Sequence, residues 1–432
     1  MVDLKHCDIE KTKVGVMGLG FAGFPIMYLF SKKYNTVGYD ISGERIKELQ
    51  EAFDRCGDFS EDDIREMLAG GAKLTTDLEE LRSCNFYVAV VPTPVDTACH
   101  PDFTCLKNVS REVASVLSAG DVVVFESTVY PGATEEICVP IIEKESGLKY
   151  NEDFFVGYSP ERINPGDPYH IHGNLVKVTS GSTPEVAAFI DRVYDSVLEQ
   201  DGGKTFLASS IRVAEACKVI ENAQRDVNVA FMNEVAQVLD ALHIDTDEVI
   251  KAMDTKWNAL GFKPGLVGGH CIGIDPYYLI DRAVSAGCQA RLMETARTIN
   301  NGMSEFVTQK VLQLIAEKGM QAKDADVLLL GFTFKENCHD VRNTRVFDIR
   351  QQLLPLTRSV EIYDPWADPK IVHEQYGIDI YDVPECLAGK KYHAIVLCVA
   401  HNEFFGMDLT KLLYPNGVLH SVKGALALQS SR

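Results

Sequence analysis

The chain has 432 residues, of which 46% are hydrophobic and 24% are charged, and its formal net charge is −20. This composition predicts a folded globular protein of two or three domains, and the acidic balance argues against a general nucleic-acid or membrane-surface binder. No apolar run predicts a transmembrane helix, the N-terminus lacks a signal-peptide pattern, and the twelve cysteines have no metal-ligand spacing. We therefore expect a cytoplasmic protein with reduced thiols and no metal site.

The first part of the chain, residues 1–205, alternates predicted strands with predicted helices. An apolar run at Val14–Met17 leads into a glycine turn and a helical stretch, Phe24–Lys33, and a second strand, Thr36–Tyr39, ends on Asp40. Further strand-like runs are Asn85–Val91, Asp121–Glu126, Phe154–Gly157 and Leu175–Val178, with helical patterns such as Ser42–Phe53 and Ser110–Leu117 between them. This alternation predicts a parallel sheet covered on both faces, a Rossmann-like domain.

The glycine turn after the first strand is a candidate dinucleotide site. Gly18 permits a tight turn, Gly20 lets the backbone approach a pyrophosphate, and Gly23 lets helix and strand pack closely. Asp40 is suited to accept hydrogen bonds from ribose hydroxyls, and its charge favours NAD over NADP. Arg45 either modifies that preference or lines the adenine, and the alternative to the whole interpretation is a turn without a ligand. The candidate cofactor-binding residues are Gly18, Gly20, Phe21, Ala22, Gly23, Asp40, Arg45 and Thr93.

The middle part, residues 206–310, opens with one long amphipathic segment from Ser209 to Leu242. Its apolar residues recur at intervals of three and four: Val213, Ala216, Ile220, Ala223, Val227, Phe231, Val235 and Leu239. This spacing predicts a helix of roughly 50 Å, which is too long for one small domain. We expect it to span two domains and to mediate a homodimer or a higher oligomer.

The last part, residues 311–432, repeats the pattern of the first. Val327–Leu330 precedes Gly331, and Val360–Tyr363 ends on Asp364 as the second strand of the first part ends on Asp40. The pattern predicts a second nucleotide-binding unit that lacks the three glycines and binds a different ligand, or binds it differently. The expected fold class is α/β, with two Rossmann-like doubly wound domains joined by a long central helix.

A reactive segment is predicted at Gly265–Tyr278, which has the sequence GLVGGHCIGIDPYY. Most cysteines in a chain of this kind are small buried apolar residues. Cys271 differs because Gly268 and Gly269 precede it and Asp275 follows four residues later. In the long helix, Lys218 and Asn222 lie one turn apart; the alternative is that they belong to an ordinary solvated face. A thiol, an ammonium group and an amide donor are suited to covalent catalysis with a stabilised oxyanion.

From about Lys13 to Leu426, the chain resembles the UDP-glucose/UDP-mannose (nucleotide-sugar) dehydrogenase family. The resemblance is carried by VGVMGLGFAG, VVPTPVD, ESTVYPG, YSPERINPGD, NAQRDVNVAFMNE, GGHCIGIDPYY and FTFKENCHDVRNT, in this order. It implies that the C6 alcohol of a UDP-sugar is oxidised twice, through a thiohemiacetal and a thioester. Two NAD molecules are then reduced, and water releases a uronic acid.

The resemblance also assigns residues. It implies that Cys271 is the nucleophile, that Lys218 and Asn222 stabilise oxyanions, and that Asp275 works with the lysine and a bound water. Glu161 is implicated in thioester hydrolysis, and Thr128 helps to hold the same water. The implied substrate-binding residues are Arg162, Lys256, Gly265, Gly268, Gly269, Lys335 and Arg342. Of these, Lys335 and Arg342 are cations that an acidic protein needs to face a diphosphate.

Departures from the family pattern bear on the substrate. UDP-glucose enzymes usually carry a second glutamate shortly after Ser-Pro-Glu, where this chain has Arg162-Ile163-Asn164-Pro165-Gly166, and Ile272-Gly273-Ile274 replaces their usual residues before Asp275. Together with the run Thr255-Lys256-Trp257-Asn258, these differences resemble the UDP-N-acetylglucosamine and UDP-N-acetylgalactosamine 6-dehydrogenases of bacterial surface-polysaccharide pathways. Ser421 stands where the family often has Asp.

The sequence therefore predicts a four-electron NAD-dependent UDP-N-acetylhexosamine 6-dehydrogenase. UDP-N-acetylmannosamine and UDP-glucose remain alternative substrates, because sugar epimers differ only in the orientation of one hydroxyl. Two other classes of protein stay open as well. One is a two-electron dehydrogenase of the hydroxyacid type, which needs no cysteine, and the other is a catalytically silent nucleotide-sugar-binding protein.

Overall fold

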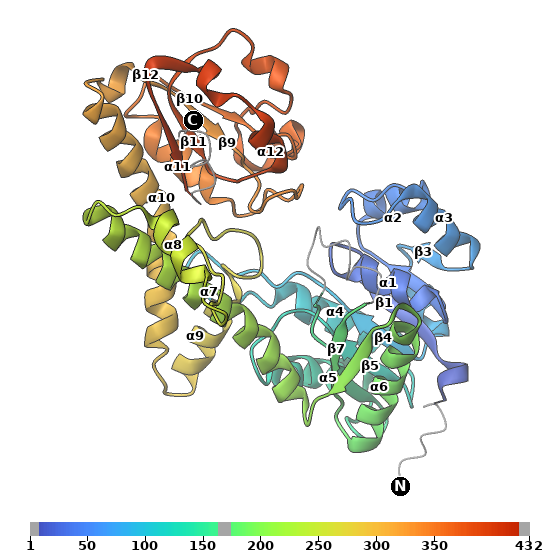
Figure 1. Cartoon of the computed structure of the whole chain (residues 1–432). Coiled ribbons are helices and arrows are strands. Elements are labelled where there is room, and N and C mark those ends of the chain that lie inside the picture. Colours follow the sequence, from blue (N-terminus) through green and yellow to red (C-terminus); the bar gives the residue numbers. More distant parts are fainter. Residues whose placement is uncertain (1–7, 163–173, 423–432) are drawn as a thin grey trace. The chain divides into compact units, whose positions relative to one another are not determined.

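The protein was analysed as a computed structural model that describes residues 8–162 and 174–422 (Figure 1). Ile163–Gly166, which entered the argument on substrate, lies outside the described residues. The chain divides into two compact units, Met1–Glu221 with Tyr277–Cys288 (unit 1) and Asn222–Pro276 with Gln289–Arg432 (unit 2). Each unit is described by itself. In the described part of the chain, no helix is both long and apolar enough to span a bilayer.

Unit 1 is built on a six-stranded sheet in which every neighbouring pair of strands is parallel. In spatial order the strands are β3 (Lys73–Thr75), β2 (Asn35–Tyr39), β1 (Lys13–Met17), β4 (Phe86–Ala89), β5 (Val122–Phe125) and β6 (Phe155–Tyr158). The order reverses direction between β1 and β4, and ligands of open α/β sheets bind at the carboxyl ends of strands at such a point.

Both faces of this sheet are buried, because successive residues of each strand point to opposite faces and nearly all are apolar. Val14, Val16, Phe86 and Val88 share one core with residues of α1, α2, α3 and α6. Tyr87 belongs to the other face, where its hydroxyl donates to the carbonyl of Val116 at the end of α4. The helices are α1 (Gly23–Ser31), α2 (Gly43–Gln50), α3 (Glu61–Ala69), α4 (Thr104–Val116), α5 (Val139–Ser146) and α6 (Pro184–Leu198).

The predicted strand at Leu175–Val178 is present as β7 (Val176–Thr179), but its partner is β8 (Lys204–Leu207) and not the large sheet. An antiparallel bridge between Gly157 and Gly181 ties the end of β7 to β6. A side chain on either glycine would collide with its surroundings, which include the backbone of Ser180 for Gly157 and that of Ala187 for Gly181. The glycines therefore allow this close approach.

The long helix is confirmed as α7 (Ile211–Ala241), and the boundary between the two units falls within it and within α9 (Asp275–Ser285). Its buried side differs from a simple apolar stripe. Small and polar residues such as Ala214, Asn222, Asp226 and Asn233 are buried. Several of the predicted apolar residues face solvent instead, among them Val213, Ile220 and Phe231.

Unit 2 contains a four-stranded parallel sheet, which confirms the second Rossmann-like domain. In spatial order its strands are β10 (Ser359–Tyr363), β9 (Asp326–Leu330), β11 (Tyr392–Leu397) and β12 (Leu413–Ser421). One face packs against residues of three helices, α10 (Arg291–Glu317), α11 (Arg345–Leu353) and α12 (Pro369–Tyr376). The other face is covered by residues of short 3-10 turns, including Leu387, Phe404 and Leu409. Unit 2 also contains α8 (Thr246–Asp254).

Candidate active site

The three glycines of the turn between β1 and α1 have different surroundings. A methyl group on Gly18 would overlap the carbonyl oxygen of Val90, and one on Gly23 would overlap the carbonyl oxygen of Gly18. Gly18 also has a φ of 93°. At Gly20, no atom lies within 4 Å of the place where a methyl group would be. Packing therefore requires Gly18 and Gly23, whereas Gly20 leaves the backbone open to a ligand.

This turn fits a dinucleotide. The N-cap of α1, Ala22, contributes no side-chain hydrogen bond, and the amide of Phe24 donates to the carbonyl of Gly20. The turn therefore offers an anionic group the open backbone around Gly20 and the positive end of the helix dipole. Phe21 and Ala22 lie half-buried in the turn itself. NAD, when bound, accepts a hydride, and the turn would hold its pyrophosphate.

Asp40 follows β2 and lies next to the turn. One carboxylate oxygen accepts the amide of Leu19 at 2.8 Å, and the other accepts the amide of Ser42 at 2.8 Å. A carboxylate has about four lone-pair sites, so two bonds leave capacity for ribose hydroxyls. The two hydrogen bonds therefore fix the Asp40 side chain in place and leave it able to accept further hydrogen bonds.

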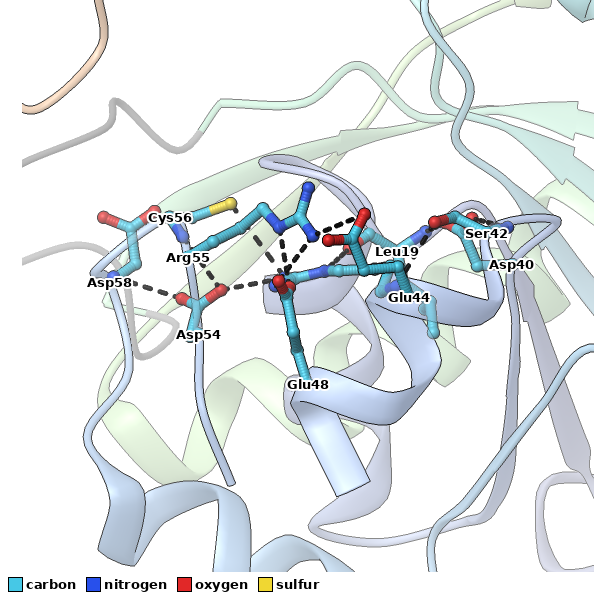
Figure 2. A network of polar contacts seen from close by, with 10 residues as sticks. Leu19, Asp40, Ser42, Glu44, Glu48, Asp54, Arg55, Cys56 and Asp58 are labelled. Atoms are coloured by element: carbon cyan, nitrogen blue, oxygen red, sulfur yellow. Dashed lines mark hydrogen bonds and ion pairs between the residues drawn. The ribbon is translucent and has the colours of Figure 1, made fainter. Parts of the chain in front are cut away.

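Arg45 belongs to a network of polar contacts that also contains Leu19 and Asp54 (Figure 2). The residue is only 5% exposed, its Nε donates to the carbonyl of Leu19 at 2.8 Å, and its NH2 group donates to Asp54 at 2.8 Å. The guanidinium therefore connects the glycine turn to the segment after α2. A cation held in this way is not available to neutralise the extra phosphate of NADP, which agrees with the preference for NAD.

At the carboxyl ends of β4 and β5, the structure brings Thr93 and Thr128 together. The Thr93 hydroxyl donates to the carbonyl of Thr128 at 2.8 Å, and the amide of Val91 donates to the hydroxyl of Ser127 at 2.8 Å. These bonds connect the segments that follow two neighbouring strands. A predicted cofactor residue and a predicted catalytic residue thus lie side by side in unit 1.

Glu161 and Lys218 also meet in unit 1. The Lys218 ammonium group donates to the backbone carbonyl of Glu161 at 3.0 Å, and the Glu161 carboxylate accepts the amide of Arg162 at 2.6 Å. The Arg162 guanidinium donates to Glu221 of α7 at 2.7 Å. Two contacts with α7 therefore hold the segment after β6 where the Ser-Pro-Glu sequence ends.

In unit 2, the structure pairs Asn222 with Asp275. The Asn222 amide nitrogen donates to the Asp275 carboxylate at 2.6 Å, and both side chains are buried. Cys271 lies in the turn before α9, is exposed and forms no disulfide. Its carbonyl accepts the amide of Asp275 at 2.9 Å. The thiol therefore precedes the amino-terminal end of a helix, where backbone N–H groups stabilise negative charge.

The glycines before Cys271 are explained by packing within unit 2. A methyl group on Gly268 would lie 2.7 Å from the carbonyl oxygen of Asn343, and one on Gly269 would lie 2.7 Å from the ring of Phe334. Gly265 is held through both its amide and its carbonyl by the side-chain amide of Asn233, at 2.8 and 3.0 Å. The reactive segment is thus fixed to α7 and to the segment between β9 and α11.

The predicted cations for the UDP portion differ in their surroundings. Arg342 forms several hydrogen bonds with the buried carboxylate of Asp340, including 2.9 Å from Nε. Lys335 is half-buried, and Lys256 is exposed. Burial, with Arg342 nearby, lowers the pKa of His270 to about 4, so this residue beside Cys271 is neutral at physiological pH.

The turn after β9 has the same backbone geometry as the glycine turn between β1 and α1, but the aspartate beside it is bonded differently. Gly331 donates its amide to Tyr363 at 2.8 Å, as Gly18 does to Tyr39 at 2.9 Å. Asp364 accepts the amides of Phe332, Thr333, Trp366 and Ala367 and a hydrogen bond from His401. Burial would raise the pKa of Asp364, but these bonds outweigh it and hold the pKa below its ordinary value.

The sequence interpretation missed a set of buried polar residues. Glu126, Lys177 and Tyr194 bond to one another in unit 1, and Asp226 bonds to Arg297 and Asn300 in unit 2. Lys177 and Arg297 could have been noticed in the sequence, because each is a charged residue within a strand or a helix. The neighbouring sequence does not identify the residues to which they bind.

The parallel sheet and the open glycine turn define a dinucleotide-binding Rossmann-like domain, and this part of the chain matches the NAD binding domain of a dehydrogenase family. Three models of the UDP-glucose/GDP-mannose dehydrogenase family match it in succession: the NAD binding domain at residues 12–198, the central domain at 212–302 and the UDP binding domain at 328–424. The chain belongs to this family and is an NAD-dependent UDP-sugar dehydrogenase. The family assignment made from the sequence motifs is confirmed.

Known relatives match nearly the whole chain. It is 44% identical to a UDP-N-acetyl-D-glucosamine 6-dehydrogenase of Salmonella typhi, over 98% of each chain. It is 45% identical to an enzyme of the same name from Pseudomonas aeruginosa, over 96% of this chain and 97% of the other. Among solved structures, UDP-D-ManNAc dehydrogenase from Pyrococcus horikoshii superposes with a TM-score of 0.85 at 27% identity, covering 95% of this chain and 99% of the other.

The contrast between the glycines gives a testable prediction. We expect Gly20→Ala to weaken NAD binding about tenfold or more with little change in thermal stability, because the added methyl group meets only the ligand. Gly23→Ala should instead destabilise the fold by about 1–3 kcal/mol, because its methyl group meets backbone. Titration with NAD and thermal unfolding of both variants measure this. Unchanged NAD affinity in a folded Gly20→Ala variant would contradict the assignment.

Proposed function

We propose that this protein oxidises the C6 hydroxyl of a UDP-N-acetylhexosamine, with GlcNAc or GalNAc as the sugar, to the uronic acid through a thiohemiacetal and a thioester on Cys271. The observation that carries the proposal is the near-complete match to two UDP-N-acetyl-D-glucosamine 6-dehydrogenases. The product would be a precursor of surface polysaccharides, and we expect the enzyme to act in the cytoplasm. The division into domains at residues 205 and 310 is also proposed.

The exposed thiol of Cys271 is the nucleophile in this proposal. In the first oxidation, C6 loses a hydride to NAD and the hydroxyl loses a proton, which gives an aldehyde. Addition of the thiol across the carbonyl forms the C–S bond of the thiohemiacetal. Loss of a second hydride and a second proton leaves a thioester. The half-oxidised sugar therefore stays bound to the chain between the two oxidations.

Asn222 and Lys218 stabilise negative charge on the reacting oxygen. An amide group has two N–H donors, and the bond to Asp275 uses one of them while fixing the orientation of the other. Lys218 supplies an ammonium group from the same helix, one turn earlier. Because it is buried and held by Asn222, Asp275 is suited to keep a water molecule in place as a proton acceptor.

Hydrolysis of the thioester is assigned to Glu161, with Thr128 helping to hold the water. Water adds to the thioester carbonyl and gives a proton to the Glu161 carboxylate; the C–S bond then breaks and the thiolate of Cys271 leaves. Over the full cycle one alcohol, two NAD and one water give one carboxylate, two NADH and three protons. Both Glu161 and Thr128 follow neighbouring strands at the same edge of the sheet in unit 1.

We further propose a homodimer that forms through α7. Five large apolar residues, on α7 or directly after it, are 47–61% exposed: Val213, Ile220, Phe231, Val238 and Leu242. They are separated by 7, 11, 7 and 4 residues, which are close to whole numbers of helical turns, so they lie on one face. A stripe of this kind on one face of a helix can pair with itself about a two-fold axis.

Substitution of Cys271 tests the covalent mechanism. We expect Cys271→Ala to abolish uronate formation and leave NAD affinity nearly unchanged, because the thiol holds the sugar and not the cofactor. The wild-type protein should release two NADH per sugar consumed, measured by absorbance against the consumption of UDP-sugar. Cys288→Ala is the matched control, because it also removes an exposed thiol. Uronate formation by Cys271→Ala, or one NADH per sugar, would refute the four-electron route.

A panel of UDP-sugars tests the specificity. We expect NADH release to be fastest with UDP-GlcNAc or UDP-GalNAc and at least about tenfold slower, in kcat/KM, with UDP-glucose, because a site built for the N-acetyl group leaves polar groups unpaired without it. UDP-ManNAc and a small hydroxyacid complete the panel. Preference for UDP-glucose would overturn the proposed substrate, and binding without any NADH would favour a silent binding protein.

The dimer has its own test. We expect Phe231→Asp to convert a dimer into a monomer, because a buried unpaired carboxylate is costly in an apolar interface. Sedimentation velocity measures the change, and Arg225→Ala on the same helix is a control for an exposed residue about a third of a turn away from the stripe. A wild-type protein that sediments as a monomer at micromolar concentration would contradict the proposal.

A further inference from the structure

A buried polar cluster lies beside Glu161 in unit 1. We define the Lys177 cluster as Glu126, Lys177 and Tyr194. The side chains of Glu126 and Lys177 are 0% and 1% exposed, and Tyr194 is also fully buried. None of the three was selected from the sequence, and none has a part in the mechanism proposed so far.

Three different elements bring the Lys177 cluster together. Glu126 directly follows β5, Lys177 is the second residue of β7, and Tyr194 lies on α6. The end of β6, three residues before Glu161, is fixed to the end of β7 by hydrogen bonds in both directions between the hydroxyl of Ser180 and the backbone of Tyr158. The distance from Lys177 to Glu161 is therefore set by regular structure.

The ammonium group of Lys177 lies between two carboxylates. It is 2.5 Å from an oxygen of Glu126 and 3.8 Å from an oxygen of Glu161. The second oxygen of Glu126 accepts the Tyr194 hydroxyl at 2.5 Å, and the Tyr194 ring lies 5.8 Å from the ammonium nitrogen. Glu126 is thus fully engaged within the Lys177 cluster, while Glu161 connects the cluster to the surface with a side chain that is 12% exposed.

The cation of Lys177 lets two carboxylates, Glu126 and Glu161, share this buried site. Two carboxylates in one buried site cannot both ionise without a cation, because each disfavours the charge of the other. Burial, with Glu161 nearby, raises the pKa of Glu126 to about 7 even though Lys177 acts in the opposite sense. Tyr194 and Lys218 also lie near Glu161, and the Lys218 ammonium group donates to its backbone carbonyl. The guanidinium of the adjacent Arg162 pairs with Glu221.

We propose that Lys177, with its charge balanced by Glu126, is a positioning residue that holds the Glu161 carboxylate in place to accept a proton from the water that hydrolyses the Cys271 thioester. The inference rests on the proposed function. In this step the proton moves from water to Glu161, the C–O bond forms and the C–S bond breaks, without oxidation or reduction. Lys177 touches neither the sugar nor the water and acts through Glu161.

The experiment compares two variants that differ only at Lys177. Glu126→Gln keeps an oxygen for the Tyr194 hydroxyl and serves as the background, and Glu126→Gln/Lys177→Met also removes the cation. The double variant has no buried unpaired charge from the Lys177 cluster, so it is expected to fold. Each is mixed with UDP-GlcNAc and NAD, and NADH release is followed by absorbance while quenched samples are analysed by intact-protein mass spectrometry.

We expect the double variant to retain a rapid burst of two NADH per site and then to turn over on the order of 10- to 100-fold more slowly than the background, without an increase in KM. A covalent uronyl adduct should accumulate on Cys271. A purely structural role for Lys177 would instead reduce the burst and the thermal stability without any adduct.

Two outcomes would overturn the proposal: turnover by the double variant equal to that of the background, or loss of the burst together with the slow phase. Glu161→Gln separates this failure from that of the proposed function. If Glu161→Gln accumulates the adduct and the double variant does not, Glu161 is the base and Lys177 is irrelevant to it. If Glu161→Gln accumulates no adduct, the assignment of the hydrolytic step to Glu161 itself is wrong.

Discussion

A carboxylate that accepts the amide of the turn after the first strand fixes the nucleotide-binding end of both sheets. Asp40 does this for Leu19, and Asp364 does it for Phe332. Hydrogen bonds to a charged group contribute about 1.5–3 kcal/mol each, so either turn would lose its shape without its aspartate. The two carboxylates differ in how many further hydrogen bonds they can accept from a ligand. Asp40 accepts two amides, and its remaining lone pairs can serve ribose hydroxyls.

In the second sheet, the corresponding aspartate, Asp364, accepts more hydrogen bonds than Asp40 does. Four backbone amides and His401 occupy the carboxylate of Asp364. The amide of Asn337 donates to Nδ1 of His401, so the proton of the ring is on Nε2, facing Asp364. No comparable capacity remains for a ribose, and the turn lacks the second and third glycines. The two turns therefore share a backbone shape but differ in the groups that they can offer a ligand, and only the first belongs to an NAD binding domain.

Local patterns were sufficient to predict the fold. The glycine turn, the alternation of strands and helices and the long helix depend on residues that are neighbours in sequence, and the structure contains all three. Contacts between distant residues were not predictable in this way. The partner of Lys177 is 51 residues away, and Asn222 and Asp275 are 53 residues apart. The periodicity of apolar residues also predicted that α7 is a helix, but it did not predict which of its faces is buried. Small and polar residues form the buried side.

The position of β7 and β8 outside the six-stranded sheet becomes understandable through the charge of Lys177. A lysine buried in a continuous apolar sheet would lose its hydration without compensation, and the cost exceeds what one ion pair returns unless the geometry and further hydrogen bonds are favourable. A short pair of strands, tied to β6 by the bridge between Gly157 and Gly181, can present this one charge to the segments that follow β5 and β6. Glu126 and the hydroxyl of Tyr194 supply the compensation there. A buried ion pair contributes little to stability by this argument, and its location beside Glu161 fits the positioning role proposed for Lys177.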